Sequence, residues 1–166
     1  MIVFNSSTLI LLAKAELLET FLAEIKDNVV IPRQVQMECC EEKQLVDALL
    51  IRKAIQERKL FVQPLKDKRL YRRILADFPL GKGEAEALAL AASRKARLFA
   101  TDDKKAIQAS KLLKIPFVTA LDILVGMYDK GLLEKLEAHA KLEALRKYGR
   151  YKREIIEDAK SRLEIR

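Results

Sequence analysis

The sequence has 166 residues and a mass of 19.0 kDa, which suits one domain with a substantial core. Charged residues make up 34% of the chain, the net charge is +8, and there are only five glycines and four prolines, so disorder and a fibrous repeat do not fit. The uncharged stretch of residues 1–13 is too short to span a bilayer and lacks the features of a signal peptide. We therefore expect a globular, cytoplasmic protein without a membrane partner.

The first part of the chain predicts a β-α-β unit followed by a third strand. Residues 2–4 are an apolar run typical of a strand, and a helical pattern follows over residues 9–24. Residues 29–31 are a second strand, after which Pro32 opens another helix. Residues 44–59 then have the period of an amphipathic helix. Residues 60–62 form a brief third strand.

The second part continues the alternation of strands and helices. Residues 84–93 are rich in alanine and strongly helical, and residues 98–101 are a fourth strand. A helix follows to about Leu113, and residues 116–118 make a fifth short strand. From Leu121 onward the pattern is helical, with breaks near two glycines.

This alternation predicts an α/β fold with three layers, α/β/α, around a parallel sheet of four or five strands. We expect the strand order 3-2-1-4-5 and a helical C-terminal tail. In this interpretation residues 1–130 form the main domain, and residues 131–166 are a helical extension packed on it.

The cysteine and histidine counts exclude several kinds of site. Cys39 and Cys40 are adjacent, which strongly disfavours a structural disulfide between them. With His139 as the single histidine, the chain cannot form a four-ligand zinc site from these residue types. Carboxylates must therefore carry most of any catalysis.

The positive charge is concentrated in one short segment. Residues 52–73 contain nine basic and two acidic residues, whereas residues 1–51 contain four basic and eight acidic ones. A solvated helix face is the simplest interpretation of such a run. A concentrated positive patch in a protein with a pI of about 9.5 also fits a polyanion such as nucleic acid.

Polar side chains follow the first and fourth strands. In a sheet of order 3-2-1-4-5 these two strands are neighbours at the point where the strand order reverses, and ligands bind at that end of the sheet. Residues 5–7 (Asn-Ser-Ser) and 101–103 (Thr-Asp-Asp) should therefore lie side by side. Glu38, on the helix after the second strand, and Glu84, in the first turn of the helix before the fourth, are further acidic candidates.

Converging oxygen ligands of this kind suit Mg²⁺ or Mn²⁺. Each acid also has a structural interpretation, because Glu84 fits the dipole at a helix start and Asp102 fits a helix cap. The indication of a metal site therefore comes from the whole set of these residues and from their spacing along the chain.

The order and spacing of these motifs resemble those of the PIN-domain nucleases, whose best-known members are the VapC-type toxins of prokaryotic toxin–antitoxin pairs. The resemblance covers nearly the whole chain. It is carried by residues 2–10, 31–38, 81–87 and 98–103, and the tail between residues 131 and 151 looks like that of one subgroup.

The resemblance implies a metal site that also forms the catalytic centre. Glu84 is preferred to Glu86 because it lies 18 residues before Asp102, a separation typical of the family. Ser7 matches a small hydroxyl residue that orients the first acid. The implied catalytic and metal-binding positions are Asn5, Glu38, Glu84 and Asp102, with Asp103 as a further metal ligand.

Asn5 stands where the family usually has an aspartate, although the subgroup that the tail resembles also has asparagine there. Its amide oxygen can coordinate a metal, but it brings no charge and cannot act as a base. We therefore expect the substitution Asn5→Asp to tighten metal binding and to raise activity.

As a whole, the resemblance implies a Mg²⁺- or Mn²⁺-dependent endoribonuclease that cleaves single-stranded RNA. It also suggests the toxin of a toxin–antitoxin pair. The basic segment would hold the RNA phosphates, with Arg69, Arg72 and Arg73 as contacts and Tyr71 as a stacking surface. A small antitoxin and a second copy of the chain, in a homodimer, are the expected protein partners. The alternative is a catalytically weakened module on the same fold that binds RNA or a protein.

Overall fold

A computed structural model describes residues 1–41 and 45–164 of the chain. Within them, five strands form one sheet in which all strand pairs are parallel, in the order β3-β2-β1-β4-β5. This confirms the predicted fold class and strand order. The strands are β1 (Ile2–Phe4), β2 (Val29–Ile31), β3 (Phe61–Val62), β4 (Leu98–Ala100) and β5 (Phe117–Val118).

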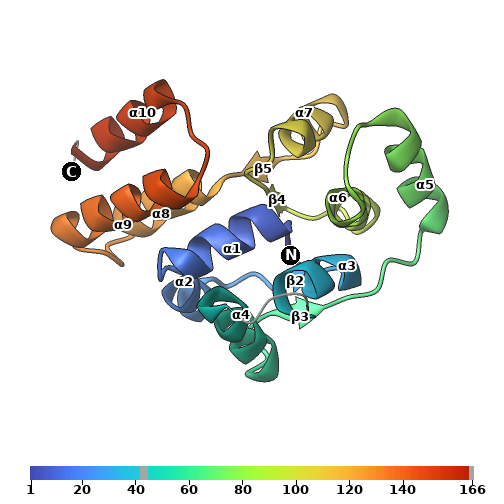
Figure 1. The fold of residues 1–166 in the computed structure, drawn as a ribbon, viewed down its shortest axis with the longest axis horizontal. Coiled ribbons are helices and arrows are strands. Elements are labelled where there is room, and N and C mark those ends of the chain that lie inside the picture. Colours follow the sequence, from blue (N-terminus) through green and yellow to red (C-terminus); the bar gives the residue numbers. More distant parts are fainter. Residues whose placement is uncertain (42–44, 165–166) are drawn as a thin grey trace.

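Helices cover both faces of the sheet (Figure 1). On one side α1 packs against α2, α4, α8 and α9, and on the other side α6 packs on β1 and β4 and against α3, α5 and α7. The C-terminal helix α10 packs against α8 and α9. The helices are α1 (Ser6–Lys14), α2 (Leu18–Glu24), α3 (Arg33–Gln36), the π-helix η1 (Met37–Glu41), α4 (Val46–Gln56), α5 (Lys68–Asp77), α6 (Lys82–Ser93), α7 (Lys104–Leu112), α8 (Ala120–Asp129), α9 (Lys135–Tyr148) and α10 (Arg153–Glu164).

The central strands are short but fully enclosed. Val3, Phe4, Val30 and Phe99 have no exposed surface, because helices cover both faces of the sheet. Every residue of β1 and β2 is therefore apolar. The first polar side chain after β1 lies at the rim of the sheet, and that position defines the candidate site.

The prediction of one helix over residues 9–24 is wrong, because this segment forms two helices with a sharp turn between them. Glu16 has a φ of +57°, in the left-handed region, which ends α1 and redirects the chain into α2. The turn lets Leu17 and Leu18 face the core. Helix α1 also begins earlier than predicted, at Ser6, because Asn5 caps it.

The bounds of helix α5 were not predicted, although a solvated helix face is one interpretation of the basic run that it partly contains. Asp67 caps it by accepting a hydrogen bond from the backbone N–H of Leu70 at 3.0 Å. The buried side chain of Ile74, one turn after Leu70, fixes its inner face. The start of the predicted helix over residues 44–59 falls partly outside the described residues, and α4 within it begins at Val46.

In the described part of the chain, no helix combines the length and the apolar character needed to cross a lipid bilayer.

Candidate active site at the switch point of the sheet

Asn5 lies at the carboxyl end of β1 and is completely buried. Its side-chain oxygen accepts a hydrogen bond from the backbone N–H of Ser6 at 2.8 Å and so caps α1. Its side-chain nitrogen donates to the hydroxyl of Thr101, just after β4, at 3.0 Å. The amide oxygen therefore caps α1, while the amide nitrogen joins the ends of β1 and β4, and a carboxylate lacks that donor.

Two hydroxyl side chains at the start of α1 bind Asp102. The Ser7 hydroxyl accepts from the backbone N–H of Asp102 at 3.0 Å, and the Thr8 hydroxyl donates to Asp102 Oδ1 at 3.3 Å. Ser7 lies 3.5 Å from the side-chain nitrogen of Asn5, at the outer limit of a hydrogen bond. The ends of β1 and β4 are thus adjacent, and Ser7 is placed by Asp102 more than by Asn5.

The Asp102 carboxylate is surrounded by donors from three parts of the fold. Besides Thr8, the backbone N–H of Ala120 at the start of α8 donates to both carboxylate oxygens, at 2.8 and 3.1 Å. The Tyr151 hydroxyl donates to Oδ2 at 2.8 Å. Burial raises the pKa of Asp102 above its ordinary value, although these three hydrogen bonds oppose that rise. Burial, followed by the charge of Asp102, also raises the pKa of Tyr151, so its hydroxyl stays a donor.

Asp103, the predicted additional metal ligand, caps helix α7. Its carboxylate accepts from the backbone N–H of Ala106 at 2.8 Å, and its own N–H donates to the Thr101 hydroxyl at 3.2 Å. The capping role that the sequence suggested for Asp102 thus belongs to its neighbour. Asp103 is half-buried and directly follows Asp102 at the end of β4.

Glu38 reaches the crevice from the π-helix η1. Its carboxylate accepts a hydrogen bond from the Ser6 hydroxyl at 3.0 Å. It also lies directly against Gly83 in the first turn of α6, where any β-carbon would collide with both carboxylate oxygens. A negative charge at this place is stabilised by the positive end of the α6 dipole. Glu38 therefore links the starts of α1 and α6.

Glu84 and Glu86, two residues apart on α6, have different surroundings. The Glu86 carboxylate accepts from the backbone N–H of Gln34 at 3.0 Å and so holds the start of α3. The Glu84 carboxylate is half-buried and folds back over Gly81, just before α6. Glu86 thus has a structural task, which agrees with the choice of Glu84 as the candidate ligand.

The oxygen donors at this edge have the right chemistry for Mg²⁺ or Mn²⁺, but the structure does not gather all of them. Asn5 and Asp102 are joined through Thr101 and Ser7, while Glu38 is joined to the same edge through Ser6. Within residues 1–41 and 45–164, no three acidic, histidine or cysteine side chains are close enough to share one metal ion. The residue types therefore fit a divalent ion, whereas the present arrangement of the carboxylates does not enclose one.

The sequence placed Ser6 and Thr101 among the polar residues at these strand ends but predicted no hydrogen-bond partners for them. Thr8, which donates to Asp102, was given no role, although its position beside them could have indicated one. Tyr151 is 49 residues away from Asp102 in sequence. Only the resemblance of the tail singled it out, and that resemblance gave it no role.

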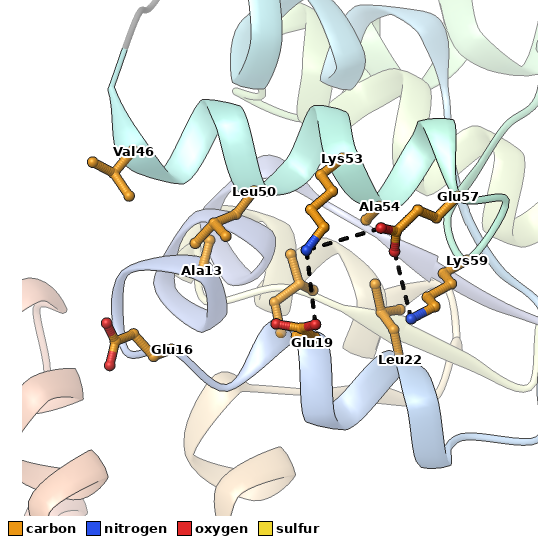
Figure 2. A pocket seen from close by; sticks show the side chains of 11 residues that line it. Ala13, Glu16, Glu19, Leu22, Val46, Leu50, Lys53, Ala54, Glu57 and Lys59 are labelled. Atoms are coloured by element: carbon orange, nitrogen blue, oxygen red, sulfur yellow. Dashed lines mark ion pairs between the residues drawn. The ribbon is translucent and has the colours of Figure 1, made fainter.

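The basic segment divides into two parts with different contacts. On and after α4, Lys53 lies 3.9 Å from both Glu19 and Glu57, and Lys59 lies 3.5 Å from Glu57 (Figure 2). Arg52 donates to the carbonyl of Cys40 at 3.0 Å. In the first part of the segment, Arg52, Lys53 and Lys59 therefore have partners within the protein.

On α5, by contrast, Arg69, Arg72 and Arg73 are exposed, and none of them has an ion pair to a described residue. Tyr71 is half-buried, and its pKa is raised by burial and by the charge of Glu86. This tyrosine therefore lies on the side of α5 that approaches α6. Part of its ring surface is covered by the protein itself.

A groove between α4 and the pair α1–α2 has a volume of about 260 Å³ and contains none of the candidate acids (Figure 2). Apolar side chains such as Leu22, Leu50 and Ala54 line it, and the paired charges of Lys53 and Glu57 lie at its rim. The groove is separate from the crevice at the ends of β1 and β4.

The fold and the crevice together define an open parallel α/β domain with acidic side chains at its switch point, an architecture that binds ligands at this edge. A family model described as a PIN domain matches residues 1–164. The chain therefore belongs to the PIN-domain family, whose members are generally nucleases that use divalent metal ions. A comparison with curated proteins finds no significant match.

Proposed function

We propose that this protein is a metal-dependent endoribonuclease that cleaves single-stranded RNA. The observation that carries the proposal is the junction of β1 and β4 in a PIN-family chain. There Asn5, Asp102 and Asp103 lie at one edge, and the Ser6 hydroxyl brings Glu38 to it. Acidic groups at this edge match the place where a parallel sheet binds its ligand.

In this proposal Mg²⁺ or Mn²⁺ is held by the carboxylates of Glu38, Glu84, Asp102 and Asp103 and by the amide oxygen of Asn5. When bound, the ion supplies an activated water and stabilises the negative charge of the phosphate that is attacked. Ser6 orients the Glu38 carboxylate, and Thr101 keeps the ends of β1 and β4 together.

The RNA-binding part of the proposal rests on the place of α5. This helix packs against α6, whose first turn contains Glu84, so its exposed arginines lie on the helix next to the candidate acids. Phosphate groups of a strand entering the crevice would meet Arg69, Arg72 and Arg73. Tyr71 offers a base the part of its ring that α6 leaves uncovered.

We also propose a toxin role, with a small antitoxin as protein partner and a homodimer as the assembly, and this part rests on the resemblance of the sequence. Three apolar side chains near the start of α4 are exposed and would gain from being covered by a partner. They are Leu45, Val46 and Leu49.

The test is cleavage of a mixed pool of single-stranded RNA with Mn²⁺ and with a chelator. Glu84→Gln should lower the rate about a hundredfold, the usual size of a lost charge-stabilising group. The matched control is Glu137→Gln, which changes an exposed glutamate that also lies in the first turn of a helix, α9. Equal rates for both variants, or cleavage that survives the chelator, would contradict the proposal.

The second candidate function is RNA binding without cleavage. It is favoured by the neutral side chain of Asn5 and by the number of protein donors that already bind Asp102. Under this alternative the wild type binds single-stranded RNA with the same affinity in Mn²⁺ and in chelator, and leaves it intact.

A further inference from the structure

Among the described residues that donate to the Asp102 carboxylate, Tyr151 alone comes from outside the core of the α/β domain. Thr8 lies on α1 and is fully buried, and Ala120 donates through its backbone at the start of α8. Tyr151 belongs to the short segment of residues 149–152 between α9 and α10, here named the C-terminal strap. Its hydroxyl donates to Asp102 Oδ2 at 2.8 Å.

Three donor groups bind the two oxygens of the Asp102 carboxylate. A carboxylate has about four lone-pair positions, two on each oxygen. On Oδ1 they meet the Thr8 hydroxyl and the Ala120 N–H, and on Oδ2 they meet the same N–H and the Tyr151 hydroxyl. A metal ion that approaches Oδ2 therefore competes with the Tyr151 hydroxyl, which makes the shorter of the two contacts to that oxygen.

Within the strap, the Tyr151 ring lies directly on Gly149, where any β-carbon would collide with it. The strap leads into α10, where Arg162 lies 3.5 Å from Asp122 of α8, the residue that completes the capping box at the start of that helix. Three side chains of α10 are also buried. They are Ile156, Ala159 and Leu163.

We propose that Tyr151 is a positioning residue that closes Asp102 to divalent metal ions, so that the strap and the ion compete for the same carboxylate oxygen. This inference rests on the proposed function, because it assigns a control to the same site. Thr8 and Ala120 belong to helices α1 and α8, whereas Tyr151 lies in the segment between two helices, and the proposal requires its hydroxyl to move away from Asp102. Loading of the site is then coupled to the position of the C-terminal helices.

The first test is calorimetric titration of the full chain with Mn²⁺. Tyr151→Phe keeps the ring and removes only the hydroxyl, so it should bind Mn²⁺ about tenfold more tightly than the wild type, as expected when one charge-assisted hydrogen bond no longer competes. Tyr148→Phe, at an exposed tyrosine three residues earlier, is the matched control and should bind like the wild type. Affinity equal to or weaker than that of the wild type would overturn the proposal, since a supporting role predicts weaker binding.

The second test follows the tyrosine directly and needs no variant to fold. In protein with ¹³C at the Cζ position of its four tyrosines, the Tyr151 resonance should shift as Mg²⁺ is added, with the midpoint of the calorimetric binding curve. A Tyr151 resonance that stays in place while the metal binds would overturn the proposal.

The two proposals fail in different ways. If wild type and Tyr151→Phe bind Mn²⁺ equally well, the strap has no effect on loading and the metal-dependent function still stands. If neither protein binds Mn²⁺ or Mg²⁺, both proposals are wrong.

Discussion

The polar groups at the ends of β1 and β4 are buried or partly buried and hydrogen-bonded by the protein, whereas the charged groups of the basic helix α5 are exposed to solvent. In the crevice, Asn5 is completely buried and Asp102 is bound by donors from three parts of the fold. On α5, arginines such as Arg69 and Arg72 are exposed, with no ion pair to a described residue. Both regions are rich in charged residues, yet only the crevice is part of the internal structure of the protein.

This comparison indicates where a change of charge will alter the free energy of unfolding. A buried charge needs hydrogen bonds or a counterion, so a change in the crevice alters the free energy of unfolding. An exposed charge is screened by water and salt, and its removal changes stability little. Changes on α5 should therefore appear in ligand binding alone.

The largest expected effect on stability is that of Asn5→Asp. The aspartate keeps the cap on Ser6, but it loses the donor to Thr101 and places a charge in a fully buried position. We expect the free energy of unfolding to fall by about 2–3 kcal/mol in chelator. Mn²⁺ should restore much of this loss, because the ion binds only the folded state.

Urea unfolding in chelator and in Mn²⁺ measures both parts of this prediction. Asn28→Asp, at an exposed asparagine, is the matched control and should change stability by less than about 0.5 kcal/mol. A stable Asn5→Asp variant that does not respond to Mn²⁺ would show that the crevice tolerates a buried charge without a metal. That result would remove the contrast between the two regions.

A smaller effect, and a pH dependence, is expected for Asp102→Asn. Because burial raises the pKa of Asp102 in the folded state, the stability that this group contributes is present below its unfolded pKa of about 3.9 and is lost as pH rises through the folded pKa. The amide can still accept from Thr8 and Ala120 and donate to Tyr151, so the net loss is about one hydrogen bond, roughly 1 kcal/mol.

Unfolding by urea at a series of pH values from about 4 upward checks this prediction. The decline of wild-type stability with rising pH should be smaller in Asp102→Asn, while Asp129→Asn, at an exposed position, should follow the wild type. Identical pH profiles for all three proteins would mean that burial of Asp102 has no consequence for folding.

The smallest effect on stability is expected on α5. Replacing Arg69, Arg72 and Arg73 by alanine should change the free energy of unfolding by less than about 0.5 kcal/mol. The slope of log affinity for single-stranded RNA against log salt should become shallower by roughly 0.7 for each lost phosphate contact. Replacing the paired residues Lys53 and Lys59 is the control and should leave the slope unchanged. An equal change in slope for both sets would show that the two parts of the basic segment bind RNA alike.

Much of the fold was predictable because short-range patterns and sheet topology agree. The five apolar runs became the five strands, and their alternation with helices led to the order that the structure has. Two helices were placed incorrectly or missed for local reasons. Glu16, whose backbone lies in the left-handed region, breaks the first predicted helix. In α5, the many charged residues conceal the cap at Asp67 and the apolar spacing around Ile74.

The candidate site was predictable only at the level of the backbone. Strand order brings the ends of β1 and β4 together, so the neighbourhood of Asn5 and Asp102 follows from topology. The partners of each side chain do not follow, because hydrogen bonds between elements far apart in sequence leave no local pattern. That is why Asp103, and not Asp102, proved to be the helix cap, and why Tyr151 had no predicted role.

By itself, the sequence determined the strands, their order and the residue types at the switch point, since these depend on apolar periodicity and on the chirality of parallel connections. Only the tertiary structure decided which charges have a partner in the folded chain. Lys53 pairs with glutamates while Arg69 does not, and Asp102 is bound by Tyr151 from the far end of the chain. The physical reason is that a charge is stabilised by whatever lies within a few ångströms of it. In a folded chain those neighbours are set by packing between elements, not by distance along the sequence.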